Sequence, residues 1–320
     1  MATTKLIGIG KVPLSDEQRK SLIGMAKAQH CEMIDLLTVG MDRLSECDAL
    51  IGHFEFDELK AAKNMQWLQV APAGVERYMA EGVLPESVTL CNGSGAYGTA
   101  IAEYMIGGLL MIQRRMVNYL DNQRAHKWLQ FPGITTLYGS RIAVIGAGDL
   151  GTSFASRCHA MGAKVVGVRR SSGAHADCYE KMFLTDQIDQ AIADADVVAL
   201  CLPSTSGTVG LFTKARIEKM KPGAILINVG RGTAVDTMAL IDALKSGHLG
   251  GALLDVTDPE PLPEDHPLWD APGAVVTPHI SGIDRDRLSA SFVFEIFKDN
   301  LTNYLTGAPL NNIVDRQRGY

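Results

Sequence analysis

The sequence lacks the features that mark secreted, membrane-bound and nucleic-acid-binding proteins. Its six cysteines include no C-x-x-C pair and no histidine partner at zinc-ligand spacing, so we expect reduced thiols, no metal site and a cytoplasmic location. The net charge of −6 offers no basic surface for nucleic acid. The N-terminal residues show no long apolar run and no cleavage-site pattern, so no signal peptide is expected.

Long uncharged hydrophobic runs are also missing. The longest apolar stretch, residues 96–112, contains Glu103 and is followed by two arginines, which favours a buried helix over a membrane span. We expect a helix over residues 99–123 that is apolar on nearly every side and must therefore be covered on every side. It either bridges two domains and meets a second subunit, or is a core helix of one domain.

Residues 140–170 predict the order strand, glycine turn, helix, strand. Gly146, Gly148 and Gly151 follow an apolar strand at the spacing G-x-G-x-x-G. The first glycine permits a tight turn, the second lets a pyrophosphate approach the backbone, and the third lets the helix pack closely on the strand. The helix then begins with free N–H groups directed at the phosphates. Because the strand before the turn, the helix and the next strand are all present, the pattern predicts dinucleotide binding.

Short apolar strands alternate with helical stretches along the chain, which predicts parallel sheets covered by helices on both faces. The expected strands are residues 5–9, 33–37, 49–52, 67–71, 88–91, 141–145, 163–168, 197–202, 224–228, 252–256 and 274–277. The length of 320 residues suits two domains. We therefore expect an α/β protein with two doubly wound parallel-sheet domains: a Rossmann cofactor domain (residues 99–287) inserted in a flavodoxin-like substrate domain (residues 1–98 and 288–320).

Three polar residues follow the last three strands of the expected cofactor domain. They are Arg231, Glu260 and His279. Taken singly, each is most simply a solvated or structural loop residue. Ligands of a doubly wound sheet bind beyond the carboxyl ends of its strands, however, and together an arginine, a carboxylate and an imidazole suit the reduction of a carbonyl group.

At these loops the sequence resembles the D-isomer-specific 2-hydroxyacid dehydrogenase family. The resemblance runs from about Ala71 onward, while the first 65 residues match only in pattern. It is carried by the cofactor turn GAGDLG, the segment LPSTSGTVGLF after the fourth strand, and the signatures NVGRG, LDVTDPEP and TPHISG. The segment AGVERY, residues 73–78, resembles the family loop whose backbone N–H groups hold the substrate carboxylate.

The resemblance implies an NAD(P)-dependent oxidoreductase acting on 2-oxo and 2-hydroxy acids. His279 would donate a proton to the carbonyl oxygen, Glu260 would favour the charged imidazole, and Arg231 would hold the substrate carboxylate. Asp255 is similar to the residue that holds the nicotinamide carboxamide. The candidate cofactor contacts are Gly146, Gly148, Asp149, Leu150, Gly151, Leu202, Pro203, Thr208 near the ribose, Val229 and Asp255. The candidate substrate contacts are Ala73, Gly74 and Val75.

One feature departs from the usual NAD-binding pattern. NAD-specific Rossmann sites place an acidic residue at the end of the second strand, where it binds the ribose 2′-hydroxyl. This chain has Arg169, Arg170 and Ser171 there. Two guanidinium groups and a hydroxyl suit a 2′-phosphate, so NADPH is the expected cofactor. The alternative is that the arginines are solvated charges at a strand end and that the enzyme uses NAD.

The expected function is the NADPH-dependent reduction of a small 2-oxo acid to the D-2-hydroxy acid, and the reverse, by a homodimer. The alternatives are a dinucleotide-sensing, corepressor-like binding protein and an NAD-dependent phosphoglycerate-type dehydrogenase. Glyoxylate, hydroxypyruvate, ketopantoate and branched or aromatic 2-oxo acids all remain open as substrates. His53, Phe54 and Tyr97 follow strand ends and are candidate pocket residues; a core position for Phe54 and a solvated loop position for His53 are the alternatives.

Overall fold

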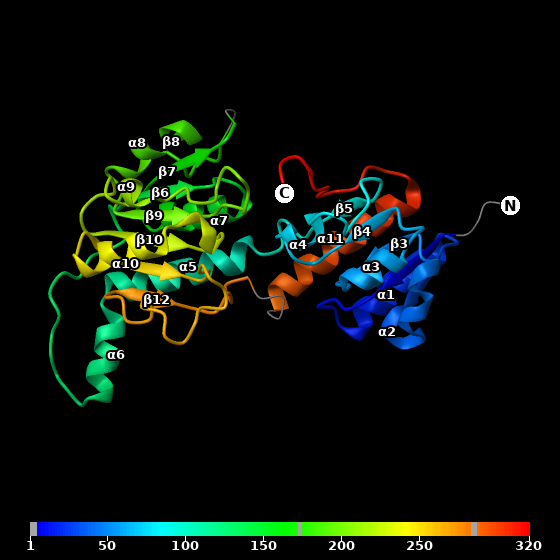
Figure 1. Cartoon of the computed structure of the whole chain (residues 1–320), viewed down its shortest axis with the longest axis horizontal. Helices are drawn as coiled ribbons and strands as arrows, with labels where there is room; N and C mark the ends of the chain where they lie inside the picture. Colours follow the sequence, from blue (N-terminus) through cyan, green and yellow to red (C-terminus); the bar gives the residue numbers. More distant parts are fainter. Residues whose placement is uncertain (1–4, 172–174, 283–286) are drawn as a thin grey trace. The chain divides into compact units, whose positions relative to one another are not determined.

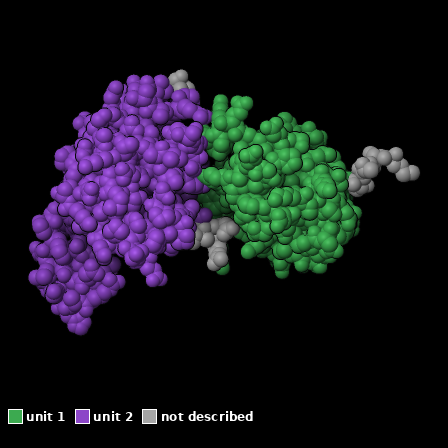
Figure 2. All heavy atoms as spheres, in the orientation of Figure 1, with its two compact units in different colours: residues 1–97, 283–320 green, residues 98–282 purple. Residues whose placement is uncertain are grey.

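The computed structural model describes residues 5–171, 175–282 and 287–320. The chain forms two compact units, which Figure 2 shows in different colours. Unit 1 consists of Met1–Tyr97 and Ile283–Tyr320, and unit 2 of Gly98–Gly282. Each unit is built around a parallel sheet of its own, which confirms the predicted α/β fold class.

The sheet of unit 1 has five parallel strands in the order β2-β1-β3-β4-β5, the flavodoxin-like order. The strands are β1 (Leu6–Ile9), β2 (Glu32–Asp35), β3 (Ala49–Ile51), β4 (Trp67–Gln69) and β5 (Thr89–Cys91). The helices are α1 (Asp16–Ala28), α2 (Leu36–Val39), the 3-10 helix η1 (Met41–Glu46), α3 (Phe56–Ala61), α4 (Glu76–Met79) and α11 (Arg287–Thr306). Helix α11, from the end of the chain, packs against α1 (Figure 1).

Local sequence explains the main elements of unit 1. Strands β1, β3 and β4 are buried along their whole length, as expected for apolar strands covered on both faces. Helix α1 begins at a capping box, in which the Ser15 hydroxyl accepts a hydrogen bond from the Gln18 N–H and the Gln18 side chain accepts one from the Ser15 N–H. The parallel strands place their carboxyl ends, and the loops that follow them, at one edge of the sheet.

The sheet of unit 2 has seven parallel strands in the order β12-β11-β10-β9-β6-β7-β8, which contains the Rossmann order. The strands are β6 (Arg141–Ile145), β7 (Lys164–Arg169), β8 (Lys181–Leu184), β9 (Val197–Leu200), β10 (Ala224–Asn228), β11 (Leu249–Leu254) and β12 (Ala274–Val276). The helices are α5 (Gly98–Gln113), α6 (Met116–Arg124), α7 (Asp149–Ala160), α8 (Ile188–Ile192), α9 (Lys214–Ile217) and α10 (Thr237–Lys245), with short 3-10 helices η2 (Thr185–Gln187) and η3 (Gly232–Ala234).

Two hydrophobic cores cover the two faces of this sheet. Alternate residues of β6 divide between them: Ile142 and Val144 pack with α5 and α7, whereas Ala143 and Ile145 pack with α8, α9 and α10. Such alternation follows from the period of two along a strand. The sheet is therefore held rigidly from both sides, and the loops beyond its strand ends are anchored on it.

Two features of unit 2 differ from the sequence prediction. Strand β8 was not predicted, because the segment KMFL is a short edge strand with only Phe183 buried. The prediction of one helix over residues 99–123 is also wrong. Arg115 takes a left-handed conformation with φ 56°, which ends α5 and begins α6. Helix α5 packs on α7 and β11, while α6 has no buried residue and extends away from the sheet (Figure 1).

The apolar stretch at residues 96–112 forms most of α5. Among residues 5–171, 175–282 and 287–320, no helix is both long and apolar enough to cross a membrane. All six cysteines are free thiols and five are buried. Burial raises the pKa of the Cys91 thiol to about 11 and that of Cys201 to about 12, so both thiols are protonated at neutral pH.

Candidate active site

The glycine turn lies between β6 and α7. Gly146 has φ 101°, a conformation that favours glycine, and a Cβ there would lie 2.4 Å from the Cys201 carbonyl oxygen. A Cβ on Gly151 would lie 2.2 Å from the Gly146 oxygen, so the helix packs directly on the turn. A Cβ on Gly148, at the N-cap of α7, would have nothing within 4 Å. The backbone is thus open only at the second glycine, where a pyrophosphate would approach, and the turn fits a dinucleotide.

The end of β7 adjoins this turn. The N–H groups of Gly146 and Ala147 both donate hydrogen bonds to the Val168 carbonyl, at 2.9 and 3.0 Å. Arg169 ends the strand half-buried, and the exposed Arg170 and Ser171 follow it. The two arginines therefore lie at the same sheet edge as the glycine turn, which is the position at which Rossmann proteins read the adenosine ribose.

The remaining candidate cofactor contacts have different surroundings. Asp149 is exposed and packs over the first residue of α5, since a Cβ on Gly98 would lie 2.8 Å from its Oδ2. Leu150, Leu202 and Pro203 are half-buried, and Val229 is 6% exposed. The Thr208 hydroxyl donates to the Pro203 carbonyl at 2.7 Å and accepts from the Thr205 N–H at 2.8 Å. Thr208 thus closes the loop that follows β9.

Asp255 follows β11 and is buried, with 1% exposure. Its Oδ1 accepts hydrogen bonds from the Thr277 hydroxyl at 2.6 Å and the Ile280 N–H at 2.8 Å. Its Oδ2 accepts one from the Ser281 N–H at 2.9 Å. The carboxylate therefore organises the loop that carries His279. A carboxylate has about four lone-pair sites, so Oδ2 retains acceptor capacity for one further donor, such as a carboxamide.

His279 and Glu260 form a side-chain contact between the loops that follow β12 and β11. The Nδ1 of His279 lies 2.6 Å from Oε1 of Glu260, and the two side chains are 46% and 41% exposed. This contact fixes the orientation of the ring and leaves Nε2 as the nitrogen that can reach a ligand. His279 has φ 52°, and its N–H donates to the carbonyls of Asp255 and Thr277 at 2.9 and 3.0 Å.

Arg231 lies between two glycines that pack tightly on neighbouring loops. A Cβ on Gly230 would lie 2.5 Å from the Leu202 oxygen, and one on Gly232 would lie 1.9 Å from the Thr257 oxygen. The arginine loop is therefore held between the loops after β9 and β11, the second of which carries Glu260. The Arg231 guanidinium is half-buried and donates from Nη1 to the Gly230 carbonyl at 2.8 Å.

In unit 1, the segment from Ala73 to Val75 follows β4. Asn92 donates from Nδ2 to the Ala73 carbonyl at 2.9 Å, and a Cβ on Gly93 would lie 1.9 Å from the Ala71 oxygen, so the loop after β5 supports it. The N–H groups of residues 73–75 have no acceptor among the described residues. Free backbone donors of this kind suit a carboxylate ligand. Sequence reasoning did not identify Asn92 as a support of this loop.

The three candidate pocket residues of unit 1 differ in burial and in their hydrogen-bond partners. His53 is partly exposed, with Nε2 2.9 Å from Arg77 Nη1 and Nδ1 3.2 Å from the Tyr78 hydroxyl. The same Nε2 lies 3.4 Å from Glu55 Oε1. Phe54 is completely buried, which does not fit a pocket-lining role and agrees with the alternative of a core position. Tyr97 is 7% exposed, and its hydroxyl donates to the Ala71 carbonyl.

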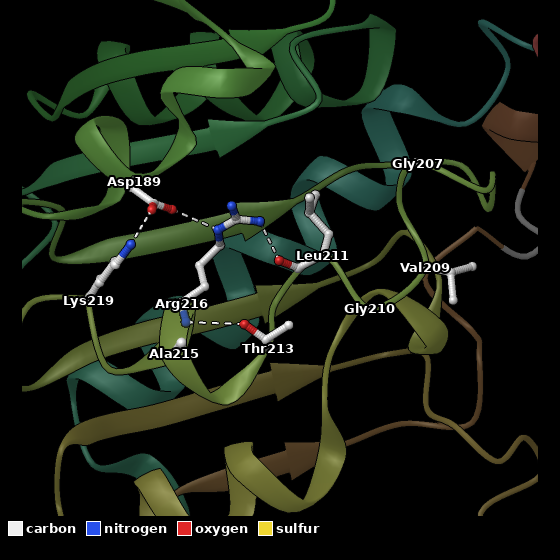
Figure 3. Close-up of a pocket in the computed structure, with 9 residues that line it drawn as sticks. All are labelled: Asp189, Gly207, Val209, Gly210, Leu211, Thr213, Ala215, Arg216 and Lys219. Carbon is white, nitrogen blue, oxygen red and sulfur yellow. Dashed lines mark hydrogen bonds and ion pairs between the residues drawn. The ribbon is translucent and has the colours of Figure 1, made fainter.

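A separate cavity of about 280 Å³ lies between the loop after β9 and helices α8 and α9. None of the candidate site residues lines it. Figure 3 shows Asp189 between two cations, with Oδ1 2.8 Å from Arg216 Nε and Oδ2 2.5 Å from Lys219 Nζ. The Arg216 guanidinium also donates to the Leu211 carbonyl at 2.5 Å. These charges satisfy one another, so the cluster joins α8 to α9 and does not indicate a ligand.

This cluster gives a pH-dependent stability prediction. The hydrogen bonds from Lys219 and then Arg216 lower the pKa of Asp189 below its usual value. A lowered pKa in the folded protein contributes stability that is present above the unfolded pKa of about 4 and is lost as pH falls through the folded value. We expect Asp189→Asn to reduce the free energy of unfolding by at most about 1 kcal/mol at pH 7, because the pair is partly exposed and screened.

Urea unfolding of the wild type and Asp189→Asn at pH 7 and at acid pH measures this difference. It should shrink as the pH falls and as salt is added. A difference that is the same at both pH values would contradict the ion-pair explanation.

Taken together, the Rossmann sheet, the glycine turn and the paired imidazole and carboxylate define a dinucleotide-dependent oxidoreductase. The family model for the D-isomer specific 2-hydroxyacid dehydrogenase NAD-binding domain matches residues 106–281. The chain belongs to this family, and it is an NAD(P)-dependent dehydrogenase of the D-2-hydroxyacid class.

Known proteins similar to this chain support the assignment. The glyoxylate/hydroxypyruvate reductase B of Yersinia pestis is 30% identical over 285 residues, which are 86% of each chain. A solved structure of a D-isomer specific 2-hydroxyacid dehydrogenase family protein from Aeromonas salmonicida is 30% identical, with a TM-score of 0.83 over 98% of this chain and 100% of that one. Another, from Xanthobacter autotrophicus in complex with NADPH and MES, is 27% identical, with a TM-score of 0.82 and full coverage of both chains.

Proposed function

We propose that the protein reduces a small 2-oxo acid to the D-2-hydroxy acid with NADPH, and catalyses the reverse reaction. The observation that carries the proposal is the 2.6 Å contact between His279 Nδ1 and Glu260 Oε1, in loops at the same strand ends as the glycine turn. We further propose that residues 99–287 form the cofactor domain and residues 1–98 with 288–320 the substrate domain. The second boundary adjoins residues 283–286, which lie outside the described residues.

The turn of Gly146, Gly148 and Gly151 would hold a nicotinamide cofactor, which would supply a hydride to the carbonyl carbon of the substrate. Negative charge then develops on the carbonyl oxygen, and His279 donates a proton to it from Nε2. Glu260 lies against the opposite nitrogen and stabilises the imidazolium before the transfer. Arg231 offers a planar fork of donors that suits the substrate carboxylate. The N–H groups of Ala73 to Val75 are further donors for a carboxylate.

The NADPH preference is supported by two observations. Arg169 and Arg170 stand at the end of β7, where NAD-specific sites have an acidic residue. The Xanthobacter autotrophicus structure, at 27% identity, contains NADPH. NAD is the alternative cofactor, and a phosphoglycerate-type activity is the alternative within the family.

Steady-state kinetics test the proposed function directly. Glyoxylate, hydroxypyruvate, ketopantoate, branched and aromatic 2-oxo acids and 3-phosphohydroxypyruvate would each be assayed with NADPH and with NADH. We expect turnover of at least one small 2-oxo acid, a preference for NADPH and a D-configured product wherever the product is chiral. An L-product or a preference for NADH would contradict the proposal, and turnover of the phosphorylated acid alone would favour the phosphoglycerate-type alternative.

We also propose that the protein is a cytoplasmic homodimer. The location rests on the cysteine pattern of the sequence. For the dimer, α6 has nine residues and none is buried, and an isolated helix of that length is marginal in water. Leu120 is 43% exposed on α6, and Trp128 beyond it is 99% exposed. A second copy of the chain would cover these apolar side chains.

Sedimentation equilibrium checks the assembly, and the expected mass is twice the 34.5 kDa of the chain. We expect Leu120→Lys to shift the equilibrium toward the monomer, whereas Lys127→Ala, a change of an exposed polar side chain near the same place, should not. A wild-type mass equal to one chain would refute the dimer.

A further inference from the structure

A chain of three side chains connects helix α5 to the loop that carries His279. The Tyr104 hydroxyl of α5 lies 2.6 Å from the Thr277 Oγ1, and the Thr277 hydroxyl lies 2.6 Å from Oδ1 of Asp255. Tyr104 and Thr277 are separated by 173 residues in sequence. Tyr104 lies outside the sequence motifs described above. Thr277 is the first residue of the signature TPHISG and immediately follows β12.

The donors and acceptors available on each group fix the direction of these two hydrogen bonds. A carboxylate only accepts, so the single proton of the Thr277 hydroxyl points to Asp255. Thr277 Oγ1 must then accept from the Tyr104 hydroxyl. Burial raises the pKa of Tyr104 to about 12, although the hydrogen bond with Thr277 acts in the opposite direction. The phenol therefore stays protonated and remains a donor over the neutral and moderately alkaline range.

Asp255 connects these side chains to the backbone of His279 and of the two residues that follow it. Its two carboxylate oxygens accept the N–H groups of Ile280 and Ser281, and its carbonyl accepts the N–H of His279. His279 has φ 52°, in the left-handed region that few residues other than glycine adopt. A residue in that region keeps its conformation only when its surroundings hold it there, and these three hydrogen bonds surround it.

We propose that Tyr104 and Thr277 are positioning residues that orient the Asp255 carboxylate and, through it, the backbone of residues 279–281 from which the His279 ring projects. Neither side chain needs to touch the substrate. The buried Asp255 could satisfy its lone pairs in more than one way, and the Thr277 hydroxyl selects the arrangement in which Oδ1 and Oδ2 face the two N–H groups. Tyr104 donates a hydrogen bond to the Thr277 hydroxyl, and this bond couples α5 to the loop that carries His279. This inference rests on the proposed function, because it assumes that His279 is the proton donor.

Three variants test the inference: Thr277→Val, Thr277→Ser and Tyr104→Phe. Valine preserves shape and removes the hydroxyl, while serine restores it. We expect Thr277→Val to lower kcat by roughly 10–100-fold, Thr277→Ser to recover to within about threefold of wild type, and Tyr104→Phe to lower kcat by about threefold to tenfold. The matched control is Tyr138→Phe, since Tyr138 is 77% exposed in the same unit and takes no part in the chain.

Amide hydrogen exchange of the segment that contains Ile280 and Ser281 provides a readout that needs no turnover. We expect faster exchange in Thr277→Val, near wild-type exchange in Thr277→Ser, and an intermediate rate in Tyr104→Phe. Faster exchange with unchanged kcat would show a purely structural role and overturn the proposal, as would wild-type behaviour of Thr277→Val in both measurements. If Thr277→Val does not fold, Tyr104→Phe, which removes only one hydroxyl, decides in the same way.

The two readouts separate this inference from the proposed function. If the proposed function is wrong, either the wild type turns over no 2-oxo acid of the panel or His279→Gln keeps the wild-type kcat, whatever the exchange measurement shows. If only the inference is wrong, His279→Gln will be impaired while Thr277→Val and Tyr104→Phe keep the wild-type kcat.

Discussion

Replacing His279 by glutamine is expected to lower kcat for 2-oxo acid reduction by roughly 10²–10⁴-fold. Glutamine can still hydrogen-bond to Glu260, but it cannot supply a proton to the oxygen on which charge develops. Affinity for NADPH, measured by fluorescence titration, should change by no more than about twofold, because the loss belongs to the transition state and not to cofactor binding. A variant that retains full kcat would remove His279 from the mechanism.

Glu260→Gln tests the partner in the same pair. The amide keeps the shape of the side chain and loses the charge that favours the imidazolium. We expect a smaller loss of kcat than for His279→Gln, and a reductive rate profile whose limb moves to lower pH. Glu264→Gln is the matched control, because Glu264 lies exposed in the same loop. An unchanged pH profile in Glu260→Gln would exclude Glu260 from the mechanism.

The sequence was sufficient to predict the parts of this enzyme that depend on local pattern. The strand and helix alternation predicted two parallel sheets, and the spacing of Gly146, Gly148 and Gly151 placed the turn between β6 and α7. Arg231, Glu260 and His279 could each be placed in a loop after a strand. In a parallel sheet all strands end at the same edge, so the common position of these loops follows from topology alone.

Other features depend on contacts between distant segments, which no local pattern records. The hydrogen bond from Tyr104 to Thr277 joins residues 173 positions apart. Phe54 follows a strand end as a pocket residue would, yet its ring fills the space beside Gly10, where a Cβ would lie 2.6 Å from it. The break between α5 and α6 depends on the left-handed backbone of Arg115. Arginine rarely adopts that conformation, so its presence in the sequence does not predict a break.

The strongest single change in cofactor use is expected at the end of β7. Arg170→Ala should lower kcat/KM with NADPH by roughly 10–100-fold, which corresponds to the loss of a charge-assisted hydrogen bond to a 2′-phosphate. NADH has no phosphate at that position, so its kcat/KM should change by less than about threefold. The ratio of the two constants is the informative quantity, because general damage to the fold lowers both and cancels in the ratio.

Two further variants sharpen this experiment. Arg170→Glu places a carboxylate where NAD-specific sites have one, so it should repel the 2′-phosphate and accept a hydrogen bond from the 2′-hydroxyl, which reverses the preference. Arg141→Ala is the control. Arg141 is an exposed arginine at the start of β6, at the opposite end of the strands, and its ion pair with Asp194 is long, at 4.0 Å. Equal losses with both cofactors in Arg170→Ala, or a wild type that prefers NADH, would mean that these arginines do not select the cofactor.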